Sequence, residues 1–363
     1  MSRNLIHYWK SDRPSAFKTL QNDQSVTITE QLVGLLTNEL KTNFNPAITN
    51  VQPAFGQGNH ATFTLEWNGK KLFVRLEDGP EKDNYMLVEA RVIALVHELG
   101  VPTVHLYKTD ASRQRVRFAY QVMDFLPCQD LNSLYKNKQI NLDKVAVEIG
   151  QYIARWQHIK PVGFGPFNTE TIAHNGNLEG LHANYSAYYY LNLDEHLSFL
   201  AQREFLPAEQ AAAIRRVIDS YESYLQLKQG CLVHKDMALW NILGTRETIK
   251  AFIDWDDTIS GDPTDDLSLL ACFHDEPVVK AAIQGYSAVR PLPEHFDIRF
   301  QLHLLRNMIV KAVIRVGGNY FKKTDDFFLI DTGEKGSSLE KFTRDRILSA
   351  LERLSNKQHQ PII

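Results

Sequence analysis

Cysteine is scarce in this sequence, which limits the compartments and the metal sites that suit it. Its three cysteines, Cys128, Cys231 and Cys272, form no C-x-x-C pair among the 363 residues. An odd number of isolated thiols predicts neither a disulfide framework nor a zinc site. We therefore expect reduced cysteines, each beside apolar neighbours, in the core of a cytoplasmic protein.

Long apolar runs and long basic runs are also missing. No stretch holds the roughly 18 apolar residues that a membrane helix needs, and residues 1–17 lack the apolar region of a signal peptide. A formal net charge of −3 argues against nucleic acid or an anionic membrane as the main partner. What is present, 44% apolar and 23% charged residues, is typical of a globular protein with room for two lobes. Nothing in it indicates an oligomeric state.

The most informative stretch runs from residue 231 to residue 257. Its polar residues Asp236, Asn241 and Asp254 each stand where a short apolar run breaks off, so buried strands would bring them to one edge. The predicted strands are residues 231–233, 241–243 and 249–253. Two carboxylates and an amide oxygen are hard ligands of the kind that Mg²⁺ prefers. Phosphoryl transfer from a nucleoside triphosphate needs two such ligands for the metal and one carboxylate for the attacking hydroxyl.

Three motifs in this region resemble those of the phosphotransferase family of the aminoglycoside and choline kinases. Residues 234–241, His-Lys-Asp-Met-Ala-Leu-Trp-Asn, match its catalytic loop His-x-Asp-x-x-x-x-Asn, and residues 253–255, Ile-Asp-Trp, match its metal-binding motif. Residues 261–267 are similar to its Gly-Asp-Pro-x-x-Asp-Leu segment. Ordinary turn and capping residues would not explain the joint spacing. Lys235 and Ala238 depart from the family, in which Gly and His are frequent at these positions.

The resemblance implies a role for each polar residue of the motifs. Asp236 is expected to orient the acceptor hydroxyl and take its proton, while Asn241 and Asp254 are expected to bind Mg²⁺. His234 and Asp266 are expected to brace the loop. The implied cofactors are therefore ATP and Mg²⁺, and the implied partner is a small molecule with a hydroxyl group.

A glycine-rich turn at residues 55–61 admits two interpretations. Gly-x-Gly-x-x-Ala fits a dinucleotide-binding turn, but such a turn must open a helix. Alternating apolar residues on both sides of Asn-Gly at 68–69 predict a β-hairpin instead. Kinases lay a turn of this kind over the phosphates of ATP, and we assign the backbone of Gly56, Gly58 and Asn59 to this role.

Four further residues are assigned to the nucleotide by resemblance. Arg75, in the second strand of the hairpin, corresponds to the basic residue that holds the α- and β-phosphates. Glu89, in the next predicted helix, corresponds to its ion-pair partner. The segment 121–127 resembles the hinge between lobes, where the backbone of Val122 and Met123 would contact the adenine edge. A solvated surface Arg and Glu are the alternative for the first pair.

Together these assignments predict an α+β protein with the two-lobed protein-kinase-like fold. An N-terminal lobe of antiparallel β-sheet with a helix, residues 1–125, would bind the nucleotide. A larger, mainly α-helical C-terminal lobe, residues 126–363, would hold the catalytic and acceptor sites. Beyond the motifs, the pattern predicts helices at 28–43, 294–316 and 337–355 and a strand at 101–104.

The predicted activity is ATP-dependent phosphorylation of a small-molecule hydroxyl. A protein kinase is the weaker alternative, because no Asp-Phe-Gly followed by Ala-Pro-Glu is present. A catalytically silent nucleotide-binding protein could keep the fold, but it would not need Asp236, Asn241 and Asp254 together.

Acidic residues crowd the region after the metal motif. Residues 254–279 contain eight Asp or Glu residues and no Lys or Arg, so they should attract a cation. Of these we assign Asp256, Asp257, Asp275 and Glu276 to a cationic acceptor such as an aminoglycoside or an amino alcohol. A solvated acidic rim is the alternative interpretation.

Overall fold

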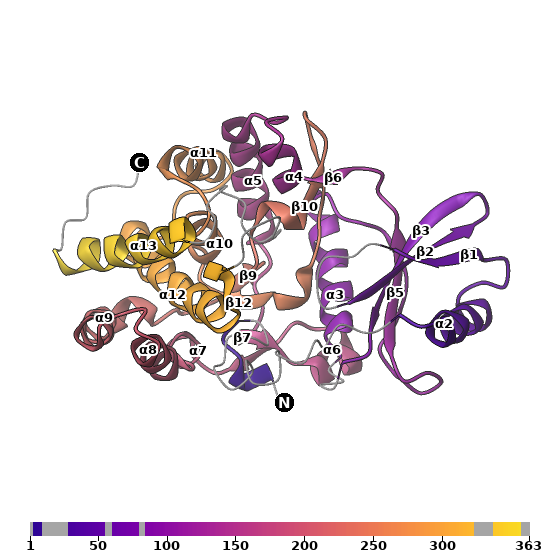
Figure 1. Cartoon of the computed structure of the whole chain (residues 1–363), viewed down its shortest axis with the longest axis horizontal. Helices are drawn as coiled ribbons and strands as arrows, with labels where there is room; N and C mark the ends of the chain where they lie inside the picture. The colour runs from indigo at the N-terminus through magenta and orange to yellow at the C-terminus, as the bar shows by residue number, and fades with distance from the viewer. Residues whose placement is uncertain (1–2, 9–27, 55–59, 80–83, 323–336, 357–363) are drawn as a thin grey trace.

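The computed structural model describes residues 3–8, 28–54, 60–79, 84–322 and 337–356. It has the predicted two-lobed α+β architecture, with a β-sheet lobe joined to a larger helical lobe (Figure 1). Within these ranges no helix combines the length and the apolar character needed to cross a bilayer.

The N-terminal lobe is built on a five-stranded antiparallel sheet in the order β1-β2-β3-β5-β4. Its strands are β1 Thr49–Pro53, β2 Ala61–Trp67, β3 Lys70–Glu77, β4 Leu106–Asp110 and β5 Ala119–Asp124. Asn68 and Gly69 join β2 to β3 with φ angles of 49° and 76°, the left-handed conformations that a tight hairpin turn requires. The predicted hairpin is therefore confirmed.

Alternation along β3 divides the sheet into two faces. Leu72, Val74 and Leu76 pack against the apolar side of helix α2, Glu30–Asn43, and form the core of this lobe. Arg75 lies on the other face and reaches helix α3, Tyr85–Glu98. Figure 1 shows α3 between the sheet and the helical lobe, so this face of the sheet looks toward the rest of the molecule.

The C-terminal lobe is mainly helical. Its described helices are α4 Leu131–Lys136, α5 Leu142–Trp156, α6 Thr169–Asn175, α7 Tyr185–Tyr189, α8 Leu193–Gln202, α9 Ala208–Ser220, α10 Asp265–Leu270, α11 Glu276–Ser287, α12 Phe296–Gly317 and α13 Ser337–Ser355. The described 3-10 turns are η1 Arg3–Leu5, η3 Glu222–Leu225, η4 Leu239–Asn241, η5 Trp255–Asp257 and η6 Tyr320–Lys322.

The helices predicted at both ends of the chain are confirmed, because α2, α12 and α13 match the expected ranges with small shifts at their ends. The strand predicted at residues 101–104 is wrong, since these residues belong to no strand or helix. Pro102 has no backbone N–H to donate to a strand ladder. Its carbonyl oxygen instead accepts a hydrogen bond from the N–H of Phe252 at 2.9 Å.

Two small sheets carry the polar motifs at the ends of their strands. The first has the order β11-β10-β6 and the second the order β8-β7-β12-β9. Their strands are β6 Gln129–Asp130, β7 Phe164–Phe167, β8 Gly180–His182, β9 Cys231–Val233, β10 Ile242–Gly244, β11 Ile249–Phe252 and β12 Ile259–Gly261. The motif loop at residues 234–241 joins the two sheets, so their packing fixes both of its ends.

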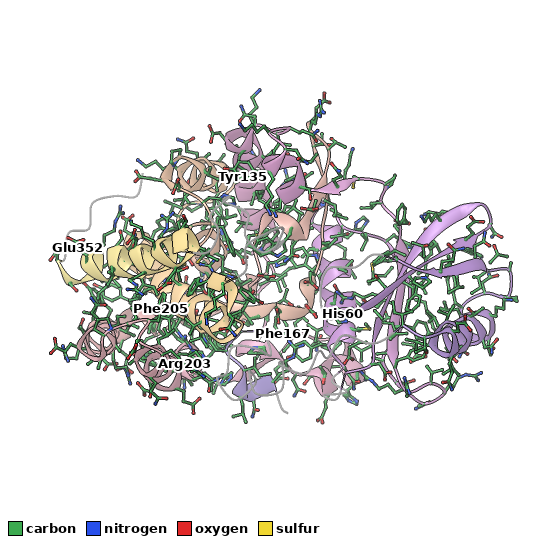
Figure 2. The ribbon with its side chains drawn as sticks, in the orientation of Figure 1. His60, Tyr135, Phe167, Arg203, Phe205 and Glu352 are labelled. Carbon is green, nitrogen blue, oxygen red and sulfur yellow. The ribbon has the colours of Figure 1, made fainter. Side chains whose placement is uncertain are left out.

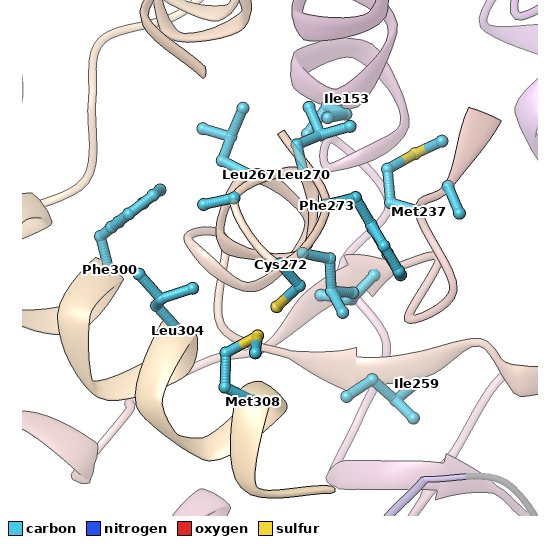
Figure 3. Close-up of a cluster of buried hydrophobic side chains, with 14 of the residues drawn as sticks. Ile153, Met237, Ile259, Leu267, Leu270, Cys272, Phe273, Phe300, Leu304 and Met308 are labelled. Atoms are coloured by element: carbon cyan, nitrogen blue, oxygen red, sulfur yellow. The ribbon is translucent and has the colours of Figure 1, made fainter. Parts of the chain in front are cut away.

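An apolar core lies beneath the loop between β9 and β10. Met237 of this loop is fully buried in a cluster that includes Ile153 of α5, Leu270 of α10 and Phe273 (Figure 3). Protein cores are close-packed, so a side chain anchored in one has little freedom to move. The backbone of the neighbouring Asp236 is thereby held in place.

Helices α5 and α11 cross with their backbones in direct contact at two glycines. A Cβ atom at Gly150 would lie 1.8 Å from the carbonyl oxygen of Ala282. A Cβ atom at Gly285 would lie 1.9 Å from the carbonyl oxygen of Val147. No other residue permits so close an approach of two backbones.

We expect Gly285→Ala to destabilise the protein by about 1–3 kcal/mol or more, because the added methyl group must displace backbone atoms. Gly34 in α2 is the matched control, since no heavy atom lies within 4 Å of its hypothetical Cβ. Gly34→Ala should stabilise the protein by up to about 1 kcal/mol through helix propensity. Denaturant unfolding measures both changes, and equal effects would contradict the close helix contact.

Candidate active site

Asp266 lies in the first turn of α10 and holds the loop that follows β9. Its carboxylate accepts hydrogen bonds from the backbone N–H of His234 at 3.0 Å, from that of Lys235 at 3.1 Å and from the indole N–H of Trp156 at 3.0 Å. Burial raises the pKa of Asp266 to about 7, although these donors oppose the shift. The ring of His234 hydrogen-bonds the carbonyl oxygen of Ile253 at 3.0 Å. These contacts fit the bracing roles expected of His234 and Asp266.

Lys235 stands where the family that this sequence resembles often has glycine. The backbone conformation of Lys235 explains that preference. Its φ of 70° lies in the left-handed region that favours glycine. Its side chain is buried, and its ammonium group lies 2.8 Å from Asp265 Oδ2 and 3.1 Å from Asn307 Oδ1. Breaking a buried pair of this kind is costly, so the pair helps to hold the strained residue.

Asp236 and Asn241 are in direct contact. The side-chain N–H₂ of Asn241 donates to Asp236 Oδ2 at 2.8 Å and to the Asp236 carbonyl oxygen at 2.9 Å. No described residue donates to the amide oxygen of Asn241, which leaves this oxygen available as a ligand. The other carboxylate oxygen of Asp236 accepts a hydrogen bond from the hydroxyl of Tyr8 at 2.5 Å. The N-terminal residues have no pattern that could have indicated this contact.

Asp254 follows β11 in a left-handed conformation with a φ of 65°. The preceding N–H, that of Ile253, donates to the carbonyl oxygen of Asn241 at 3.0 Å, so the two expected metal ligands lie on adjoining segments. The Asp254 side chain is 40% exposed, but the surrounding protein still removes part of its hydration. This desolvation and the charge of Asp256 raise the pKa of Asp254 well above the usual carboxyl value, and Arg75 opposes the shift. Negative charge is therefore in excess here, and a bound cation would relieve it.

Arg75 joins the sheet to the helical lobe. Its guanidinium group forms an ion pair with Glu89 of α3 and lies 3.0 Å from Asp254 Oδ1. Glu89 is 3% exposed and also accepts a hydrogen bond from the backbone N–H of Trp255 at 3.3 Å. The expected pairing of Arg75 with Glu89 is present, and it is buried rather than solvated.

The other residues assigned to the nucleotide lie elsewhere. Gly56, Gly58 and Asn59 fall outside the described residues. Val122 and Met123 lie within β5, which has β3 on one side and β4 on the other. Their backbone groups therefore face neighbouring strands instead of a ligand. Residues 125–127 follow the strand and belong to no strand or helix, and the carbonyl oxygen of Leu126 accepts a hydrogen bond from the N–H of Cys128 at 2.8 Å.

Two of the four acidic residues assigned to the acceptor belong to η5, close to the motif residues. Asp256 lies 3.6 Å from the ring of His60, which precedes β2 and is labelled in Figure 2. Although burial opposes it, the pKa of Asp256 is lowered below its usual range by His60 and Arg75. Asp257 lies 3.3 Å from the guanidinium group of Arg3 in the N-terminal segment.

The other two acidic residues lie at the surface, at the start of α11. Asp275 is 3.0 Å from Arg346, and Glu276 is 2.9 Å from Lys280. Their side chains are 87% and 58% exposed, as expected for a solvated rim. The structure thus separates the four residues into a pair in η5 and a pair on the outer surface.

The donor set suits a magnesium ion that arrives with a nucleotide. Among the described residues, no group of three or more His, Cys, Asp or Glu side chains could hold a metal ion by itself. The amide oxygen of Asn241 and the free carboxylate oxygen of Asp254 provide two hard oxygen donors. Magnesium commonly takes one or two protein ligands and completes its shell with phosphate oxygens and water. The residues present therefore fit the group.

Comparison with protein families agrees with this geometry. A model of the phosphotransferase enzyme family matches residues 51–296. This span begins within β1 and includes β2 to β12, the loop with Asp236, and Asp254. No curated protein matches the chain in sequence.

Solved structures share the fold at low sequence identity. Aminoglycoside phosphotransferase APH(4)-Ia, as a thermostable mutant, aligns with a TM-score of 0.58 at 14% identity over 87% of this chain and 98% of its own. Spectinomycin phosphotransferase APH(9)-Ia, crystallised with ADP and spectinomycin, aligns with a TM-score of 0.57 at 16% identity over 92% and 100%. A protein assigned as a fructosamine-3-kinase, from Thermobifida fusca, aligns with a TM-score of 0.56 at 17% identity over 83% and 94%.

Proposed function

This chain belongs to the phosphotransferase enzyme family and is a small-molecule kinase, and we propose that it moves the γ-phosphate of ATP, bound with Mg²⁺, to a hydroxyl of its acceptor. One observation carries the proposal. The carboxylate of Asp236 is braced by its loop, is held by Asn241, and accepts a hydrogen bond from the Tyr8 hydroxyl at 2.5 Å. This is the contact that a general base makes with an attacking hydroxyl.

In this mechanism Asp236 orients the acceptor hydroxyl and receives its proton as the phosphoryl group is transferred. Arg75, held by Glu89, neutralises charge on the phosphates. Magnesium, when bound, draws charge from the transferring phosphate, and Asn241 and Asp254 would hold it. His234 and Asp266 act only through the position of the loop.

A catalytically silent nucleotide-binding protein is the competing function. The contact between Asn241 and Asp236 weighs against it, because simple nucleotide binding needs no aligned base. Thermal shifts with ATP and Mg²⁺, together and apart, distinguish binding that depends on the metal from binding that does not. A ligand at a hundred times its Kd should add roughly 2.7 kcal/mol to stability. Turnover with any small-molecule acceptor would rule the silent protein out.

The acceptor proposed from the sequence is a hydroxylated amine. Asp257 supports it, because this residue already holds a cation, Arg3, in the same segment whose Tyr8 contacts Asp236. Solved relatives in complex with hygromycin B and with spectinomycin share the fold. Asp275 lends no support, since it lies exposed on the outer surface.

Asp236→Asn should keep the fold and ATP binding but reduce kcat by roughly 10² to 10⁴, because the general base is lost while its shape is kept. The assay is ATP consumption across aminosugars, amino alcohols and antibiotics. Asp143→Asn, an exposed residue in the first turn of α5, is the control and should retain full activity. Turnover near that of the wild type in Asp236→Asn would remove Asp236 from this role.

Asp254→Ala should abolish the contribution of Mg²⁺ to nucleotide binding, because the metal would keep only the neutral amide oxygen of Asn241. Titration calorimetry with ATP, in the presence of Mg²⁺ and with a chelator instead, separates the metal-dependent part of the affinity. The titration with chelator is the control, and the affinity for ATP measured in it should differ little between the wild type and Asp254→Ala. Unchanged affinity for Mg·ATP in the variant would refute the proposed metal site.

Asp257→Asn should lower the preference for a cationic acceptor over a neutral hydroxylated analogue, measured as the ratio of their kcat/KM values. In the wild type, the KM of the cationic acceptor should rise with ionic strength, because salt screens such attraction over a Debye length of about 8 Å. Glu276→Gln, at an exposed residue that pairs with Lys280 at the start of α11, is the control and should leave the ratio unchanged. A salt-independent KM and an unchanged ratio in Asp257→Asn would contradict a cationic acceptor.

A further inference from the structure

The N-terminal residues 3–8 form a segment that is anchored at several points. Arg3 lies over the ring of Tyr85 in α3 at 3.5 Å, and Ile6 is buried. The ring of His7 stacks on that of Tyr188 at 4.7 Å, and the hydroxyl of Tyr188 donates to the carbonyl oxygen of His7. In Figure 1 the segment is the short indigo turn beside β7 and α7. These contacts therefore fix the position of Tyr8, the last described residue of this segment.

The hydroxyl of Tyr8 occupies the place that we propose for an acceptor hydroxyl. It donates to Asp236 Oδ1 at 2.5 Å, while Asn241 occupies Oδ2. Arg3 of the same segment lies 3.3 Å from Asp257. The segment thus offers this site both a hydroxyl and a cation, the two groups of the acceptor proposed above.

A buried cation stands beside the phenol ring. The ammonium group of Lys311 in α12 lies 5.0 Å from the ring centre of Tyr8 and 4.5 Å from that of Phe273. The side chain is 7% exposed, and no carboxylate of the described residues forms an ion pair with it, although the charge of Asp236 opposes the lowering of its pKa by burial. A buried ammonium without a carboxylate partner favours negative charge nearby. Transfer of a phosphate to the phenol would supply such charge.

We infer that Tyr8 is an intramolecular phosphate acceptor, a modification site that rests on the proposed function of the same centre. In the transfer, the Tyr8 oxygen forms a bond to the γ-phosphorus of ATP and the bond from that phosphorus to the β-phosphate oxygen breaks. ADP leaves, and Asp236 receives the phenol proton. The new phosphate carries about −1.5 to −2 charges at neutral pH. Each chain reacts once, because the transfer consumes the Tyr8 hydroxyl.

The test incubates the full-length protein with Mg²⁺ and γ-labelled ATP in the absence of any external acceptor. We expect label to approach about one phosphate per chain, as a single transfer event requires. Trypsin should release it on the peptide of residues 4–10, Asn-Leu-Ile-His-Tyr-Trp-Lys, in which Tyr8 is the only hydroxyl side chain. The label should survive acid, which distinguishes phosphotyrosine from phosphohistidine at His7. The rate per chain should not depend on protein concentration, because both groups belong to one molecule.

Variants test the geometry. Asp236→Asn should abolish labelling, and Tyr8→Phe should remove the label from this peptide. Tyr224→Phe, a partly buried tyrosine of η3, should label like the wild type. Lys311→Met should slow labelling without changing the peptide that carries it.

Three results would overturn the inference in distinguishable ways. If an external acceptor is phosphorylated while residues 4–10 stay unlabelled, Tyr8 is no acceptor and the proposed function stands. If neither the chain nor any acceptor receives phosphate, the proposed function fails and this inference fails with it. Labelling that rises with protein concentration would show transfer between molecules and exclude the intramolecular step.

Discussion

The position of the loop that carries Asp236 depends on one buried carboxylate. Asp266 accepts the two backbone N–H groups of His234 and Lys235 and the indole N–H of Trp156. A buried donor left without an acceptor costs about 1–3 kcal/mol, so losing this carboxylate would penalise three groups together. The loop cannot turn away from α5 and α10 without breaking these bonds. These hydrogen bonds therefore fix the position of Asp236, although Asp236 takes part in none of them.

A second constraint joins the two lobes through charge. Arg75 bridges Glu89 on α3 and Asp254 after β11, so one guanidinium group ties the sheet, the helix and the metal motif together. Asp256 adds another carboxylate nearby, and a single arginine does not balance the three. A magnesium ion bound with the nucleotide would offset the resulting excess of negative charge. The residues that join the lobes are therefore the same ones to which we assign the nucleotide and its metal.

What the sequence could predict depended on the range of the interaction. The Asn-Gly turn at 68–69 and the spacing of the motif around Asp236 are local features, and the structure contains both the hairpin and the loop. Contacts across long separations had no local signature. Tyr8 meets Asp236 across 228 residues, and Lys235 meets Asn307 across 72. Such pairs follow from how distant segments of the chain pack together, which local residue patterns do not encode.

The Tyr8 hydroxyl lies against Asp236 Oδ1, so an external acceptor that placed its hydroxyl there would have to displace the Tyr8 ring. Diluting the protein does not weaken this competition, because Tyr8 and Asp236 belong to the same chain. The apparent dissociation constant of any acceptor equals its intrinsic value divided by the fraction of molecules in which the segment has left. A segment docked about nine-tenths of the time would make binding look about tenfold weaker. Acceptor screens on the unmodified chain would then underestimate the intrinsic affinity of the proposed acceptor site.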